Sequence, residues 1–122
     1  MSSQPYLFVY GTLTSGFSNR YARRLRREAK YMGLARMPGR LYRLRGYPGM
    51  RPPRDSTDFV TGELYRLRLP ARTLAVLDEW EETYRRELHR ATLDSGEAFQ
   101  AWVYVYRVPL PERRRVPSGE WV

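Results

Sequence analysis

Apolar and polar residues alternate with two different periods in the first third of the chain. Residues 6–10, "YLFVY", are apolar and aromatic and predict a strand, because such side chains favour a pleated, half-buried surface. The run stops at Gly11, and the glycine- and hydroxyl-rich segment "GTLTSGFSN" predicts a loop. Over residues 21–32 the apolar positions recur at helical spacing, with Asn19 as a candidate N-cap and Gly33 as a candidate C-terminal glycine. We therefore expect a strand, a loop and a helix in this order.

Two hexamers of similar sequence predict strands in the middle of the chain. The first, "GRLYRL", begins at Gly39 and alternates apolar and basic side chains towards an expected turn at Tyr47-Pro48-Gly49. The second, "GELYRL", lies within an expected strand over residues 59–69. The similarity of the hexamers favours two paired strands over a true internal repeat.

A second helix and a hairpin are expected in the last part of the chain. Pro70 suits the first turn of a helix that should end near Glu81, and a hairpin is expected around Asp94-Ser95-Gly96. The prolines of "PLPERRRVPSGEW" predict a tail without regular structure. Strands outnumber helices without regular βαβ alternation. The predicted fold class is therefore α+β (mixed α/β), a small mixed or antiparallel β-barrel with about two helices. We expect one domain over residues 1–122, with residues 117–122 as a C-terminal tail motif.

Composition narrows the functional classes. The chain has no cysteine, which excludes disulfides, thiol nucleophiles and cysteine-based zinc sites. It has no apolar run of the roughly 20 residues that a membrane helix needs, and its first residues do not resemble a secretory leader. We therefore expect a cytoplasmic protein without a membrane partner.

The formal net charge of +9 comes almost wholly from arginine. A positive field concentrates anionic metabolites and gives non-specific affinity for nucleic acid. Nucleic-acid binding is therefore one interpretation of the chain, but no nucleic-acid motif accompanies the charge, and a solvated surface is the more economical interpretation.

Candidate acid–base chemistry rests on carboxylates. The single histidine, His89, lies in an expected strand, where a surface or hydrogen-bonded role is typical. By contrast, the segment "LDEWEETYRRE" concentrates acidic residues in a basic chain. Crowded carboxylates raise one another's pKa, as a general base working near neutrality requires. The alternative is a solvated acidic helix end, which the helix dipole disfavours. The acidic residues of the segment are Asp78, Glu79, Glu81, Glu82 and Glu87.

Three stretches together resemble the gamma-glutamylcyclotransferase-like family. They are "FVYGTLTSG" at residues 8–16, "LDEWE" followed by "YRR" within residues 77–86, and "PSGEW" at residues 117–121. Between them, "GRLYRLRGYPGM" and "VTGELYRL" are similar to the two intervening strand segments of the family. The resemblance runs in the same order from about residue 6 to residue 121.

The resemblance implies a small mixed barrel with a pocket at the end of its first strand. It also implies an enzyme that converts a gamma-glutamyl amine or amino acid into 5-oxoproline and the free amine, with neither a cofactor nor a metal. A non-catalytic module of the same fold that binds a small carboxylate is the alternative, because retained residues do not prove turnover.

The resemblance also assigns site residues. Glu81 corresponds to the family's acid/base glutamate, and Glu82 stands where the family usually has glycine. Tyr84 and Arg86 match the family's "Y-x-R", and both could line the pocket, or Arg86 could pair with an acid and fix the loop. Tyr104 is expected to face inward. The loop expected to bind the glutamyl group consists of Tyr10, Gly11, Thr12 and Leu13, with Tyr47 as a candidate wall.

Overall fold

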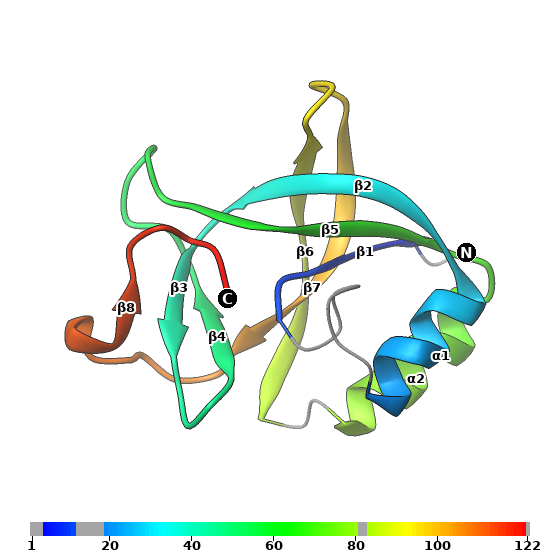
Figure 1. Cartoon of the computed structure of the whole chain (residues 1–122), viewed down its shortest axis with the longest axis horizontal. Helices are drawn as coiled ribbons and strands as arrows, with labels where there is room; N and C mark the ends of the chain where they lie inside the picture. Colours follow the sequence, from blue (N-terminus) through cyan, green and yellow to red (C-terminus); the bar gives the residue numbers. More distant parts are fainter. Residues whose placement is uncertain (1–3, 12–18, 81–82, 122) are drawn as a thin grey trace.

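The strands form one continuous sheet, part of which closes on itself as a barrel (Figure 1). The computed structural model describes residues 4–11, 19–80 and 83–121. In chain order the elements are β1 (Tyr6–Val9), α1 (Arg20–Glu28), β2 (Ala29–Pro38), β3 (Arg40–Arg43), β4 (Pro48–Arg51), β5 (Phe59–Leu67), α2 (Pro70–Trp80), β6 (Tyr84–Leu93), β7 (Ala98–Tyr106), the 3₁₀ helix η1 (Glu112–Arg114) and β8 (Arg115–Val116).

Five of these strands close the barrel. The order of the sheet is β1-β5-β2-β6-β7-β4-β3-β8, and β1 also pairs with β7 in parallel at Leu7 and Trp102. The circuit β1-β5-β2-β6-β7 is therefore closed, while β4, β3 and β8 extend from β7 as a side sheet beginning at the pairing of Met50 with Val105. The expected small mixed barrel with two helices is confirmed.

Apolar side chains pack on both faces of the barrel wall. Successive side chains of an extended chain point to opposite faces, so Phe8 of β1 and Tyr10, directly after it, lie in the interior cluster, whereas Leu7 and Val9 lie in a second cluster outside it. The outer cluster includes the helix residues Leu25, Leu74 and Leu77. Helices α1 and α2 therefore cover the outer face of the wall that contains β1, with both helices on the same side of the barrel (Figure 1).

Helix α1 is shorter than its periodicity predicts. Asn19 is the expected N-cap, with its side chain accepting a 2.9 Å hydrogen bond from the Ala22 amide. The helix ends at Glu28, however, and residues 29–38 form β2 because their backbone groups pair with β5 from Ala29 opposite Leu67 onward. The prediction of a helix to residue 32 is therefore wrong. Gly33 lies at a bulge in β2 with φ of 135°, so it ends no helix.

The two similar hexamers do not pair with each other. Strand β3 pairs with β4 and β8, whereas β5 pairs with β1 and β2. The expected turn is also displaced along the chain. The amide of Leu44 donates to the carbonyl of Tyr47 at 2.8 Å, and Gly46 has φ of 77°, so the chain reverses before Pro48 and Gly49, which belong to β4. The turn therefore depends on the positive φ of Gly46 and not on the sequence Tyr47-Pro48-Gly49.

The predictions for α2 and for the last hairpin are confirmed. Helix α2 begins at Pro70 and buries Leu74 and Leu77. Strands β6 and β7 pair antiparallel from Tyr84 opposite Tyr106 to Thr92 opposite Ala98.

The C-terminal tail contains regular structure, contrary to the sequence prediction. After η1, β8 pairs with β3, and the carbonyl of Gly119 accepts a 2.8 Å hydrogen bond from the amide of Thr61. These pairings give backbone groups of the tail hydrogen-bond partners in β3 and β5, although the prolines of the tail favour irregular structure.

Charged side chains fasten the tail to the barrel at Asp58. Its buried carboxylate accepts from Arg40 Nε at 2.7 Å, from Arg115 Nη2 at 2.9 Å and from the amide of Arg54 at 2.8 Å. Glu112 accepts from Arg40 Nη1 at 3.1 Å. The hydrogen bond from Arg40, followed by that from the Arg54 amide, outweighs the effect of burial and lowers the pKa of Asp58 to about 2.

This network predicts an acid-sensitive part of the stability. Because the pKa of Asp58 is lower in the folded chain, its contribution is complete above about pH 4 and is lost as the pH falls through about 2. We expect Asp58→Asn to lower the free energy of unfolding at neutral pH and to flatten its decline between about pH 4 and 2. Urea unfolding across this range measures both. Asp94→Asn, in the exposed β6–β7 turn, serves as the control, and an unchanged slope in Asp58→Asn would contradict the assignment.

Candidate functional site

The end of β1 is fixed by the hydroxyl of Tyr10. This buried hydroxyl donates to the backbone carbonyl of Tyr104 in β7 and accepts from the backbone amide of Met50 in β4 at 3.0 Å. Three strands therefore meet at one side chain, directly before Gly11. Tyr10 therefore holds the start of the segment that the family resemblance assigns to substrate binding.

Gly11 lies where β4 approaches the end of β1. A Cβ atom on Gly11 would lie 2.6 Å from Cγ of Pro48, a distance at which the two segments would have to separate. Glycine therefore allows the close contact between β1 and β4. Thr12 and Leu13, the other two predicted loop residues, lie outside the described residues.

Tyr84 of β6 also bonds to Pro48. Its hydroxyl donates to the carbonyl of Pro48 at 2.6 Å, and its ring meets the ring of Tyr106 edge-on, with centroids 5.5 Å apart. Tyr47, next to Pro48 in the chain, is 40% exposed. The structure thus brings Tyr10, Gly11 and Tyr84 together around β4, with Tyr47 at the surface of that group.

Arg86 forms an ion pair with Asp78, as one of the two interpretations of this residue expected, and its role in lining the pocket stays a prediction. Arg86 Nε and Nη2 donate to the two carboxylate oxygens of Asp78 at 2.9 and 3.1 Å, and its guanidinium lies 4.2 Å from the centre of the Trp102 ring. The hydroxyl of Tyr104 donates to Asp78 Oδ1 at 2.8 Å. We refer to Asp78, Arg86 and Tyr104 as the α2 clamp, because they join the last turn of α2 to β6 and β7.

The α2 clamp holds the Asp78 carboxylate in its ionised form. Partial burial on its own would raise the pKa of Asp78, but the hydrogen bonds from Arg86 and Tyr104 outweigh it, so the pKa is lowered. An ionised carboxylate paired with arginine is suited to anchoring and not to exchanging protons near neutrality. Glu81, the predicted acid/base, lies outside the described residues and follows α2 directly in the sequence.

The other carboxylates of the acidic segment separate. Glu79 is exposed on α2, whereas Glu87 contacts His89 Nε2 at 2.8 Å. Because side chains alternate along β6, Glu87 and His89 project from the face opposite to Tyr84 and Arg86. The expected crowding of carboxylates therefore does not extend to the described members Asp78, Glu79 and Glu87.

The sequence did not reveal what Asp78 and Tyr104 do. Tyr104 is buried, but it lies in the outer cluster beneath the helices, so the expectation that it faces inward is wrong. Its bond to Asp78 joins residues that are 26 positions apart. The sequence contained one sign of the α2 clamp: Arg86, a candidate partner of an acid, lies in the same segment as Asp78. It contained no sign of the bond between Tyr104 and Asp78.

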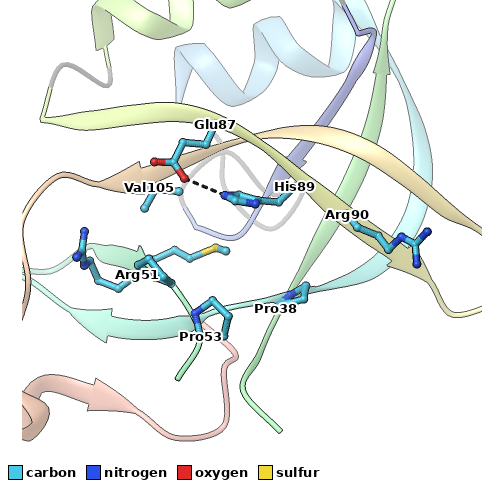
Figure 2. Close-up of a pocket in the computed structure, with 9 residues that line it drawn as sticks. Pro38, Arg51, Pro53, Glu87, His89, Arg90 and Val105 are labelled. Carbon is cyan, nitrogen blue, oxygen red and sulfur yellow. Dashed lines mark hydrogen bonds and ion pairs between the residues drawn. The ribbon is translucent and has the colours of Figure 1, made fainter. Parts of the chain in front are cut away.

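Glu87 and His89 border a separate pocket, with Arg51 and Arg90 at its two ends (Figure 2). Tyr10, Gly11, Tyr47, Tyr84 and Arg86, the described residues that the family resemblance and the sequence assign to the substrate site, do not line this pocket. Within residues 4–11, 19–80 and 83–121, no group of three His, Asp or Glu side chains is arranged to hold a metal ion. Over the same residues, no helix has the length and apolar character needed to cross a membrane.

Comparison with known proteins identifies the family. The family model described as "Gamma-glutamyl cyclotransferase, AIG2-like" matches residues 7–122. The chain belongs to the gamma-glutamylcyclotransferase-like family. It is 31% identical over 126 residues to the gamma-glutamylcyclotransferase family protein YtfP of Escherichia coli strain K12, covering 95% of each chain.

Solved structures share the fold of this gamma-glutamylcyclotransferase-like chain. An AIG2-like protein from Mus musculus superposes with a TM-score of 0.78 at 22% identity, over 99% of this chain and 90% of the mouse chain. The protein PH0828 from Pyrococcus horikoshii superposes with a TM-score of 0.68 at 22% identity, over 94% of this chain and 87% of its own. At these identities the similarity concerns the fold alone.

The α2 clamp predicts a local change when its carboxylate is neutralised. We expect Asp78→Asn to lower the free energy of unfolding by only about 0.5–1 kcal/mol, because the pair is partly exposed and screened by solvent. Amide hydrogen exchange should accelerate in the last turn of α2 and remain unchanged in the interior strands. Glu79→Gln, one residue away and exposed, is the matched control. Unchanged exchange in α2 would show that the clamp does not hold the helix end.

Proposed function

We propose that this chain is an enzyme that cyclises a gamma-glutamyl amine or amino acid to 5-oxoproline and releases the free amine. Glu81 is the general acid/base in this proposal, and the segment from Tyr10 to Leu13 binds the glutamyl group. The family membership and the order of its motifs support it. The proposal includes a small-molecule substrate, no specific nucleic-acid partner and a cytoplasmic location.

The reaction needs only one protein base. The α-ammonium of the substrate loses a proton to the Glu81 carboxylate, and the resulting amine attacks the γ-carbonyl carbon to form the lactam C–N bond. As the bond to the leaving nitrogen breaks, Glu81 returns its proton to that nitrogen. The released amine takes up the second proton lost by the α-nitrogen and departs as an ammonium ion.

The nucleophile belongs to the substrate, so binding geometry supplies much of the catalysis. Holding the chain of the substrate in its cyclising conformation captures intramolecular proximity, which contributes about 7 kcal/mol or more in favourable systems. Backbone amides at the end of β1 would stabilise the developing oxyanion or hold the α-carboxylate. Glu81 requires a pKa raised towards neutrality to act in both directions.

One observation supports this proposal more than any other. Tyr104 donates through its hydroxyl to Asp78, three residues before Glu81 in the sequence, and accepts through its carbonyl from Tyr10, at the start of the glutamyl-binding segment. A single residue of β7 therefore connects the elements that precede both functional segments. Such a connection favours a fixed spatial relation between a base and a binding loop.

The proposal predicts the effect of removing the base. Glu81→Gln keeps the size of the side chain but cannot accept a proton, so turnover should fall by about 10²- to 10⁴-fold while ligand affinity changes little. The measurement is 5-oxoproline formation from a panel of gamma-glutamyl amines and gamma-glutamyl amino acids. Glu79→Gln and Glu82→Gln are the matched controls, and both should retain most of the wild-type rate.

Each alternative outcome has a distinct meaning. Full activity in Glu81→Gln would assign the base to another carboxylate. No product from any member of the panel, together with tight binding of a gamma-glutamyl compound to the wild-type chain, would identify a carboxylate-binding module and refute the enzyme.

A further inference from the structure

Helix α1 lies on the outside of the barrel and carries a row of arginines on its outer side (Figure 1). The helix buries Ala22 and Leu25, and Leu25 packs in the outer cluster against the barrel wall. Positions three, four and seven residues apart lie on one side of a helix, and here four such positions lie on the side opposite to Ala22 and Leu25. They are Arg20, Arg23, Arg24 and Arg27, which we refer to as the α1 stripe.

The arginines of the α1 stripe are not arranged to stabilise the helix. The first turn of α1 contains no acidic residue and begins with Arg20, although the helix dipole favours negative charge at this end. Like charges three or four residues apart also repel each other, and neighbouring members of the stripe have this spacing. Only Arg26 and Arg27, in the last turn, suit the dipole. The positive charge of the helix is therefore a cost to its stability unless an anion neutralises it.

Carboxylates of the described chain do not supply that anion along the α1 stripe. Glu28 is the only acidic residue among the first 54 residues of the sequence. Its carboxylate already accepts from the Thr73 hydroxyl at 2.7 Å and lies 3.1 Å from Arg24 Nε. Within the described part of the chain, neither Arg20 nor Arg27 forms an ion pair with a carboxylate, and both are exposed. These two positions are therefore open to an anion from solution.

We propose that the α1 stripe is a docking surface for nucleic acid, which it contacts through the phosphate backbone and without sequence preference. A guanidinium group matches the geometry of a phosphate with two hydrogen bonds, and a nucleic acid repeats phosphates along its length as the helix repeats arginines. Contacts to phosphates carry no sequence information, which agrees with the absence of a nucleic-acid motif from the sequence. The proposal does not depend on the cyclotransferase activity, because it uses none of the residues assigned to that reaction.

The burial of the apolar side of α1 favours nucleic acid over a membrane surface. A helix that binds a membrane inserts apolar side chains among the lipids and places its cationic side towards the headgroups. In α1 the apolar residues Ala22 and Leu25 are buried in the protein, so the exposed side offers charge alone. Charge alone is sufficient for a phosphate backbone, whose counterions are released when arginines replace them.

The proposal predicts how the affinity depends on salt. The probe is a short, fluorescently labelled DNA duplex of mixed sequence, and its binding to the full chain is measured by anisotropy between about 50 and 200 mM salt. The test variant is Arg20→Gln/Arg27→Gln, because glutamine and arginine have similar helix propensities. Each lost phosphate contact removes about 0.9 from the slope of log K against log salt, so the slope should decrease by about 1.8. Binding at about 50 mM salt should weaken by at least about tenfold.

A matched control removes the same charge elsewhere. Arg45→Gln/Arg113→Gln changes two exposed arginines, one in the turn between β3 and β4 and one on η1, elements that lie across the molecule from α1 (Figure 1). This variant should keep the wild-type slope and affinity. Thermal unfolding at low salt gives a second readout. Because the α1 stripe variant relieves repulsion, its Tm should equal or exceed that of the wild type.

Four results would overturn the proposal. The first is no binding of the duplex at about 50 mM salt. The second is an equal loss of affinity and slope in the control variant, which would show that net charge alone acts. The third is a lower Tm in the α1 stripe variant, which would give the two arginines a structural role. The fourth is tighter binding to vesicles of phosphatidylcholine and phosphatidylserine than to the duplex, which would assign the surface to a membrane.

Discussion

Two hydrogen bonds of Tyr104 connect the parts of the molecule on which the proposed chemistry depends. Its hydroxyl donates to Asp78 at 2.8 Å, and its carbonyl accepts from the hydroxyl of Tyr10. The first bond joins the last turn of α2 to β7, and the second joins the end of β1 to the same strand. Water competes poorly for the buried bond between Tyr10 and Tyr104, so this connection constrains the geometry strongly, whereas the bond to Asp78 is partly exposed. Strands β1, β4 and β6 pair with β7 and hold Tyr104 in the position that these two bonds require.

The arrangement around β1 explains how distant segments of the sequence meet. Strand β1 is packed on both faces, by the barrel interior and by the helices, and its end is tied to β4 through Tyr10 and through the contact of Gly11 with Pro48. Arginines then fix the periphery: Arg40 and Arg115 hold Asp58, and Arg86 holds Asp78. Part of the strong positive charge is therefore used in structural ion pairs, which the net charge alone does not reveal.

The sequence predicted the elements whose signals are local. The α2 start at Pro70, the hairpin at residues 94–96 and the strand before Gly11 each depend on a few neighbouring residues, and the order of the motifs indicated the family.

Features that depend on distant residues were mispredicted or missed. The end of α1 was mispredicted because pairing of Ala29 with β5 outweighed the helical period, and the tail was mispredicted because its partners lie in β3 and β5. Arg86 was recognised as a candidate partner of an acid, but its bond to Asp78 and the role of Tyr104 require the three-dimensional fold. The pocket beside His89 combines residues of four strands and leaves no local pattern.

The most direct test of the account is the structure of the chain bound to 5-oxoproline. Cyclisation at the end of β1 requires the lactam beside Gly11, with its carboxylate or carbonyl oxygen on the backbone amides that follow Tyr10 and the Glu81 carboxylate next to its ring nitrogen. That position is the result expected if the α2 clamp and Tyr10 together define the active site. A lactam bound elsewhere, for example between Arg51 and Arg90, or a different carboxylate beside its ring nitrogen, would contradict the account.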